Sequence, residues 1–165
     1  YAVAGLNRGG ISKAIEIRKR LASDVRDDLY EGRVNPIRYI TNQGIVAWGQ
    51  KTLQQDASAL DRINVRRLLI TAKKFIASAS QYLVFEQNVE ATRQRFLSIV
   101  NPYLASIQER NGLYSFRVEC SEANNTPDMI HRNILYAQIW LQPARAAEYI
   151  IIDFNITRTG ATFSS

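Results

Sequence analysis

The chain has 165 residues, and its 21 Lys and Arg residues outnumber its 15 Asp and Glu residues, which gives a net charge of +6. This length fits one domain, and 46% hydrophobic with 22% charged residues favours a folded chain over a disordered one. A single Cys excludes an internal disulfide bond, and one Cys with one His cannot form a structural zinc site.

The basic charge is unevenly distributed and comes mainly from the 16 Arg residues, which favour forked contacts to carboxylates or phosphates. Residues 8–20 and 60–76 each carry a net charge of +4. Such segments can bind nucleic acid, an acidic protein surface or a membrane surface, and a solvated face is an equally good explanation for either one.

No targeting signal or membrane span is expected. The start of the chain lacks the charged and apolar regions of a signal peptide, and uncharged stretches such as 75–85 and 133–144 are too short to span a bilayer. No linker or repeat divides the sequence, so we expect a single domain over residues 1–165. Its abrupt start indicates that it was cut from a longer protein.

The first quarter of the chain predicts short elements. Residues 11–19 alternate apolar and charged side chains and fit a strand. A helix is expected over 24–31, with Gly32 at its end. Short strands are expected over 37–41 and 44–48.

Two long helices are expected next. Residues 59–86 contain neither Gly nor Pro, and their apolar residues recur at helical spacing. At about 100° per residue, the basic residues of this helix form two rows, namely Arg62, Arg66 and Lys73, and Arg67 and Lys74. The second helix covers 89–110, and Pro102 should kink or interrupt it.

The last third of the chain shows the alternation of strands, over 114–120, 133–142 and 148–157. Leu135, Ala137, Ile139 and Leu141 share one face of the middle strand. Its other face is also apolar, so both faces can be covered. We therefore predict an α+β fold in which a mixed or antiparallel sheet is flanked by the two long helices.

Catalytic and cofactor chemistry finds little support. Residues 44–52 nearly match a phosphate-binding loop, but Lys51 stands one position late and breaks the register that the loop needs. His131 is the only imidazole and is best explained as a surface or hydrogen-bonded residue. Cys120 falls on the apolar face of a predicted strand and is expected in the core. We expect no enzyme, cofactor or metal, and the functional alternative from the residues alone is a basic nucleic-acid-binding module.

Seven segments resemble, in the same order, the C-terminal domain of contractile tail sheath proteins. They are Ala4–Gly9, Asp28–Tyr30 followed by Val34–Arg38, Gly44–Gly49 followed by Lys51–Leu53, Asn64–Leu68, Phe85–Asn88, Asn125–Pro127 and Pro143–Glu148. The resemblance covers essentially the whole chain. The ending Thr159–Phe163 is most similar to sheaths of large contractile-tailed bacteriophages, and the related sheaths of R-type bacteriocins and type VI secretion systems remain alternatives.

The resemblance implies a structural role. Sheath subunits polymerise into rings and a helix around an inner tail tube, and they contract without ATP to drive the tube through the target cell envelope during genome ejection. The implied partners are further copies of the subunit, the tube protein, and baseplate and tail terminator proteins. The implied location is the virion tail, with assembly in the host cytoplasm.

The resemblance also implies that strands exchanged between subunits complete the sheet. Residues 147–165 then form a C-terminal arm whose inter-subunit strand includes Ile150, Ile152, Phe154 and Ile156. Pairing of this strand within its own subunit is the alternative. The family's N-terminal arm lies far upstream, so we expect an isolated fragment to lack one exchanged strand.

The same family places this domain against the tube, where complementary charge holds it. Two surfaces qualify, and the sequence does not decide between them. The candidate tube-facing or neighbour-facing residues are Arg62, Arg66, Arg67, Lys73 and Lys74 on the first long helix, and Arg132 in the segment 128–132.

Overall fold

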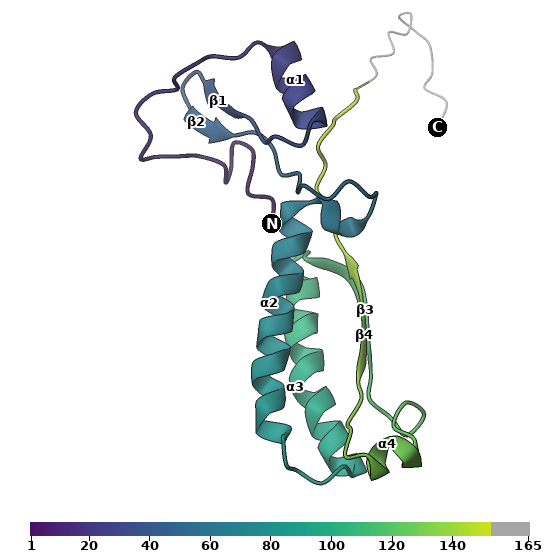
Figure 1. The fold of residues 1–165 in the computed structure, drawn as a ribbon. Coiled ribbons are helices and arrows are strands. Elements are labelled where there is room, and N and C mark those ends of the chain that lie inside the picture. The colour runs from purple at the N-terminus through teal and green to yellow at the C-terminus, as the bar shows by residue number, and fades with distance from the viewer. Residues whose placement is uncertain (153–165) are drawn as a thin grey trace, which may run out of the picture.

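The computed structural model describes residues 1–152. Two long helices lie side by side, and a two-stranded sheet lies along one of them (Figure 1). The smaller N-terminal elements lie at one end of the helix pair, and a short helix lies at the other end. In chain order the elements are α1 (Ser23–Glu31), β1 (Ile37–Ile40), β2 (Gly44–Ala47), α2 (Ile63–Ser80), α3 (Glu90–Glu109), β3 (Leu113–Glu119), α4 (Pro127–His131) and β4 (Gln138–Pro143).

Helix α2 is shorter than the sequence predicts. A 3-10 turn over Ala59–Asp61 precedes it, and another over Gln81–Leu83 follows it. At the start, the Ser58 hydroxyl accepts a hydrogen bond from the Leu60 N–H at 3.1 Å, and Arg62 is extended, so the α-helix begins only at Ile63. Beyond its end, Phe85 has a positive φ of 71°, which no helix accommodates.

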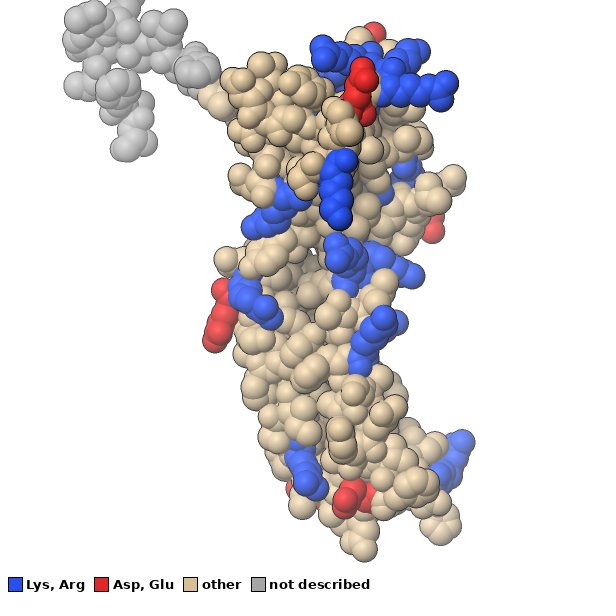
Figure 2. Space-filling model, turned by 90° about the vertical axis from the view of Figure 1, so that its left-hand side faces the viewer, with Lys and Arg blue, Asp and Glu red and all other residues tan. Residues whose placement is uncertain are grey.

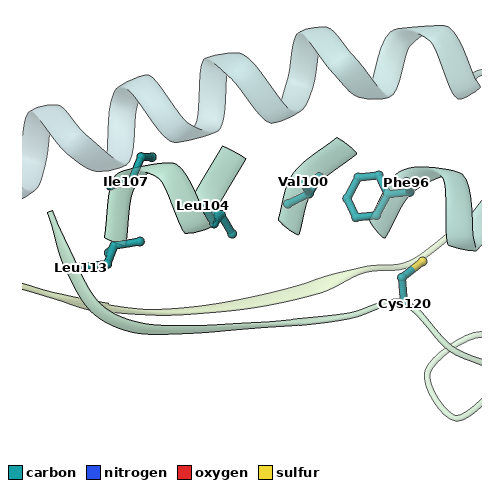
Figure 3. Packing of buried hydrophobic residues seen from close by; sticks show 6 residues of the cluster. All are labelled: Phe96, Val100, Leu104, Ile107, Leu113 and Cys120. Atoms are coloured by element: carbon teal, nitrogen blue, oxygen red, sulfur yellow. The ribbon is translucent and has the colours of Figure 1, made fainter. Parts of the chain in front are cut away.

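Helix α3 supplies most of the core. Phe96, Val100, Leu104 and Ile107 recur at helical spacing and are buried together with Leu113 and Cys120 (Figure 3). The prediction that Cys120 is a core residue is confirmed, since it is only 1% exposed. The expected interruption at Pro102 does not occur, because α3 continues through this residue. Pro102 is exposed, while Val100 and Leu104 on either side of it are buried in the core.

Strands β3 and β4 pair antiparallel, with Phe116 opposite Leu141 and Val118 opposite Ile139. The predicted inner face is confirmed, because Leu135, Ala137, Ile139 and Leu141 all pack against the core cluster. The opposite face is not covered within residues 1–152, where Tyr136 and Trp140 are 40% and 45% exposed.

Strand β4 begins five residues later than predicted because the Asn125 side chain hydrogen-bonds to the backbone that precedes it. This buried side chain accepts a hydrogen bond from the Tyr136 N–H at 2.7 Å and donates one to the Tyr136 carbonyl at 2.9 Å. The Asn88 side chain donates to the Ile134 carbonyl at 3.0 Å. These backbone groups are therefore satisfied without a strand partner.

The prediction of helices with antiparallel strands is confirmed, but the single sheet is wrong. The described residues form two separate two-stranded sheets, β1–β2 and β3–β4. Helix α3 lies between α2 and the β3–β4 sheet, so the helices share one side of it (Figure 1). The predicted strand over 11–19 is also absent: only Gly10 bridges to Val46, and Ile15 is fully exposed with no face to pack against.

Candidate assembly surfaces

The C-terminal segment exposes a run of large apolar side chains. After β4 the chain forms no strand up to residue 152, and Tyr149, Ile150, Ile151 and Ile152 are 78%, 82%, 86% and 65% exposed. Four such residues in succession form a patch that soluble proteins normally cover with a partner. The predicted strand over 148–157 is thus unpaired in its described part, while Phe154 and Ile156 lie outside the described residues.

Glu148 anchors the start of this segment. The Arg62 guanidinium donates to both carboxylate oxygens of Glu148, from Nε at 2.7 Å and from Nη2 at 3.0 Å. The Tyr30 hydroxyl donates at 2.9 Å and the Gln50 amide at 3.1 Å. One carboxylate therefore joins α1, the chain after β2, the start of α2 and the C-terminal segment.

The electrostatics of this cluster favour the ionised carboxylate. Burial would raise the pKa of Glu148, but the hydrogen bonds from Arg62, Tyr30 and Gln50 and the positive charge of Arg62 together lower it. Burial, followed by the hydrogen bond to Glu148 and the negative charge of that carboxylate, raises the pKa of Tyr30 to about 12. At neutral pH the cluster thus contains an ionised acceptor, an Arg cation and a protonated Tyr donor.

Helix α2 presents a second surface, which is basic. Arg66, Arg67, Lys73 and Lys74 are exposed on it, and α2 contains no acidic residue. Figure 2 shows the molecule from the α2 side, where Lys and Arg outnumber Asp and Glu. Arg62, which the sequence places in the same row, instead contacts Glu148 and also Asp61 at 2.8 Å. Only the fold brings Glu148 to it, 86 positions along the chain.

Arg132 lies apart from the other basic candidates. It follows α4, at the end of the helix pair far from the N-terminal elements (Figure 1). Its side chain is 66% exposed and makes only a loose ion pair with Asp128, with 3.9 Å between Nη1 and Oδ2. The two surfaces that the sequence left open are therefore distinct places on the molecule.

The remaining chemistry of residues 1–152 is sparse. They contain no cluster of three or more His, Cys, Asp or Glu residues that could hold a metal ion, and none of their helices is long and apolar enough to cross a membrane. Residues Gly44–Ala47 of the near-match to a phosphate loop form strand β2, which pairs with β1. The Lys51 N–H donates to Asn35 at 2.8 Å rather than facing an open loop.

Comparison of the sequence with known proteins gives consistent matches. Residues 55–157 match the family described as phage tail sheath C-terminal domain. The tail sheath protein of Vibrio phage KVP40 is 44% identical over 161 residues, which are 98% of this chain and 24% of that protein. The tail sheath protein of Enterobacteria phage T4 is 40% identical over 160 residues, covering 97% and 24%. The chain thus spans about a quarter of the length of these relatives.

Solved structures with a similar fold come from contractile injection systems. The contracted PVC sheath complex of an extracellular contractile injection system superposes with a TM-score of 0.85 at 25% identity, covering 94% of this chain and 45% of that one. The contracted helical sheath of the anti-feeding prophage gives a TM-score of 0.80 at 27% identity, covering 94% and 44%.

Proposed function

The chain belongs to the phage tail sheath C-terminal domain family, and on that premise we propose that it is the tube-proximal part of a contractile tail sheath subunit. The subunit would polymerise around the inner tail tube and contract to drive it through the target cell envelope during genome ejection. The observation that carries the proposal is the match of almost the whole chain to tail sheath proteins. The similar folds of contracted sheaths support a structural role over nucleic-acid binding.

The exposed C-terminal segment supports assembly by strand exchange between subunits. An extended apolar segment that leaves the fold can add to an open strand edge of another chain. Strand β1 pairs only with β2 among residues 1–152, so its other edge can accept such a strand. We propose that Ile150, Ile152, Phe154 and Ile156 belong to the exchanged strand, in the arm formed by residues 147–165.

The basic surface supports a charge-based grip on acidic neighbours. Arg66, Arg67, Lys73 and Lys74 on α2 offer cations without local carboxylates on the helix, and Arg132 offers another at the far end. Exposed ion pairs contribute only about 0.2–1 kcal/mol each, which suits contacts that must release when a sheath expands. The further partners that we propose are the tube, baseplate and tail terminator proteins, in a virion tail assembled in the host cytoplasm.

The function is tested by electron microscopy of the full-length gene product, paired with filter binding to DNA at physiological salt. We expect striated tubular assemblies and weak, salt-sensitive DNA retention. Tight DNA binding by a protein that forms no tubes would replace the sheath assignment with the nucleic-acid-binding alternative.

A further inference from the structure

A groove of about 440 Å³ lies between the first residues of the chain and the helix pair α2–α3. Val3, Leu68 and Ile107 give it an apolar floor, and Arg8, Arg67 and Arg110 contribute its positive charge. No Asp or Glu lines it. We call it the arginine groove.

The charge of the arginine groove is not compensated within residues 1–152. Arg8 stacks on the Tyr1 ring at 4.4 Å, and Arg110 Nε donates to the Ser106 carbonyl at 3.0 Å. Neither these two nor Arg67 forms an ion pair with a carboxylate in the described part of the chain. Three exposed guanidinium groups therefore remain for an acidic partner.

Helix α1 carries a complementary surface on the same molecule. At about 100° per residue, its four carboxylates fall within an arc of roughly 100°. They are all exposed, and none forms an ion pair within residues 1–152; the four are Asp24, Asp27, Asp28 and Glu31. Arg26 does not neutralise them, because its guanidinium donates to the Leu21 carbonyl and the Ser23 hydroxyl. We call this the acidic face of α1.

We propose that the acidic face of α1 in one copy of the chain docks against the arginine groove of the next copy. The two surfaces have opposite charge, and within one described chain they leave each other unpaired. Because they are different surfaces, a docked pair still presents one free acidic face on one copy and one free groove on the other. Such a heterologous contact generates a ring or an open helical array rather than a closed two-fold dimer. The proposal rests on the sheath function, since it concerns contacts between copies.

A nucleic acid fits the arginine groove less well. Of the two aromatic residues that line it, Tyr103 is stacked on Phe75, with 3.7 Å between ring centroids, and Tyr1 carries the Arg8 guanidinium 4.4 Å from its ring centroid. One face of each ring is therefore not open to a base. The apolar floor favours the aliphatic part of a protein surface, and α1 offers Val25, which is 41% exposed beside the carboxylates.

Charge reversal on each surface tests the pairing. Two variants of the 165-residue chain are compared by sedimentation at low salt, Asp27→Arg/Asp28→Arg and Arg67→Asp/Arg110→Asp. All four positions are exposed, so circular dichroism should show an unchanged fold. Each variant alone should need a roughly tenfold or higher concentration than wild type to associate, because like charges now face each other. An equal mixture should associate again, because each reversed surface finds its complement on the other variant.

The matched control for the groove variant is Arg18→Asp/Lys19→Asp, which makes the same change in net charge as that variant at exposed residues outside both surfaces. It should associate like wild type. Association of the separate variants at wild-type concentration would overturn the proposal, as would a mixture that stays dissociated.

The same variants in the full-length gene product separate this proposal from the sheath function. Wild-type tubes that are lost in each variant and restored in the variant with all four substitutions support it. If groove reversal leaves sheath tubes intact but abolishes attachment to the tail tube, the occupant is the tube protein and the proposal is wrong. If wild type forms no tubes, the sheath function fails, while sedimentation of the 165-residue chain still decides the pairing.

Discussion

Arg62 and Glu148 form a forked ion pair between the start of α2 and the first residue of the exposed C-terminal segment. Both oxygens of the carboxylate receive N–H groups of the guanidinium, at 2.7 and 3.0 Å, and the two side chains are only 25% and 17% exposed. The pair fixes where the run Tyr149–Ile152 leaves the domain. An arm that must reach a neighbouring copy gains from a fixed origin, because less chain has to be ordered on assembly.

Replacing Glu148 by Gln tests how much this ion pair stabilises the fold. The substitution removes the charge but keeps the size, and it leaves Arg62, Tyr30 and Gln50 without their ionised acceptor. We expect a loss of about 1–3 kcal/mol in the free energy of unfolding, measured with urea. The control is Asp128→Asn, whose exposed 3.9 Å ion pair should contribute less than about 0.5 kcal/mol. Equal effects of the two substitutions would contradict the anchoring role of Glu148.

The same cluster predicts how stability depends on acid pH. Because folding lowers the pKa of Glu148, its contribution is present above the ordinary value of 4.5 and is lost as the pH falls through the lowered pKa. Wild type should therefore lose more unfolding free energy between pH 6 and pH 3 than Glu148→Gln does. Parallel pH profiles for the two proteins would show that the pKa of Glu148 is not lowered in the folded chain.

At alkaline pH, the contribution of Tyr30 to stability should be lost. Folding raises the pKa of Tyr30 from 10.0 to about 12, so its contribution is fully present below pH 10 and is lost as the pH rises through about 12. Tyr30→Phe should remove this part of the alkaline destabilisation. Ultraviolet titration of the phenolate in wild type measures the shift, and a Tyr30 that ionises near pH 10 in the folded chain would contradict it.

The core of the helix pair rests on α3. Leu104 is fully buried at 0% exposure among Val100, Ile107 and Leu113, so Leu104→Ala should cost about 2–5 kcal/mol through lost burial and a cavity. Leu53 is 84% exposed, and Leu53→Ala should change stability by less than about 0.5 kcal/mol. Urea unfolding distinguishes the two, and a small effect at Leu104 would place the core elsewhere.

The sequence predicted the structure correctly where local patterns determine it. The second long helix, expected over 89–110, is α3 (Glu90–Glu109), and strand alternation identified the buried face with Ile139 and Leu141. The sequence did not predict structure that depends on contacts from outside the segment. The start of β4 is one case, because the Asn125 side chain hydrogen-bonds to the backbone of Tyr136. The rows of basic residues predicted on helix α2 likewise did not indicate the ion pair between Arg62 and Glu148. No periodicity within α2 signals a carboxylate from elsewhere in the chain.

Salt should weaken the proposed grip on the tail tube. The screening length falls from about 10 Å at 0.1 M to about 3 Å at 1 M ionic strength, so contacts of exposed Arg66, Arg67, Lys73, Lys74 and Arg132 would lose most of their attraction. Co-sedimentation of sheath with tube should decrease steeply over this range. Association that is independent of salt would exclude a grip based on these cations.

We propose that the exposed C-terminal segment carries sheath assembly, so Ile152→Asp should block assembly. Ile152 is 65% exposed in the described chain, so the substitution should leave the fold and solubility intact, with Ile152→Val as the matched control. Electron microscopy of the full-length protein should show tubes for wild type and Ile152→Val, but only unassembled subunits for Ile152→Asp. Normal striated tubes formed by Ile152→Asp would exclude this role of the C-terminal segment.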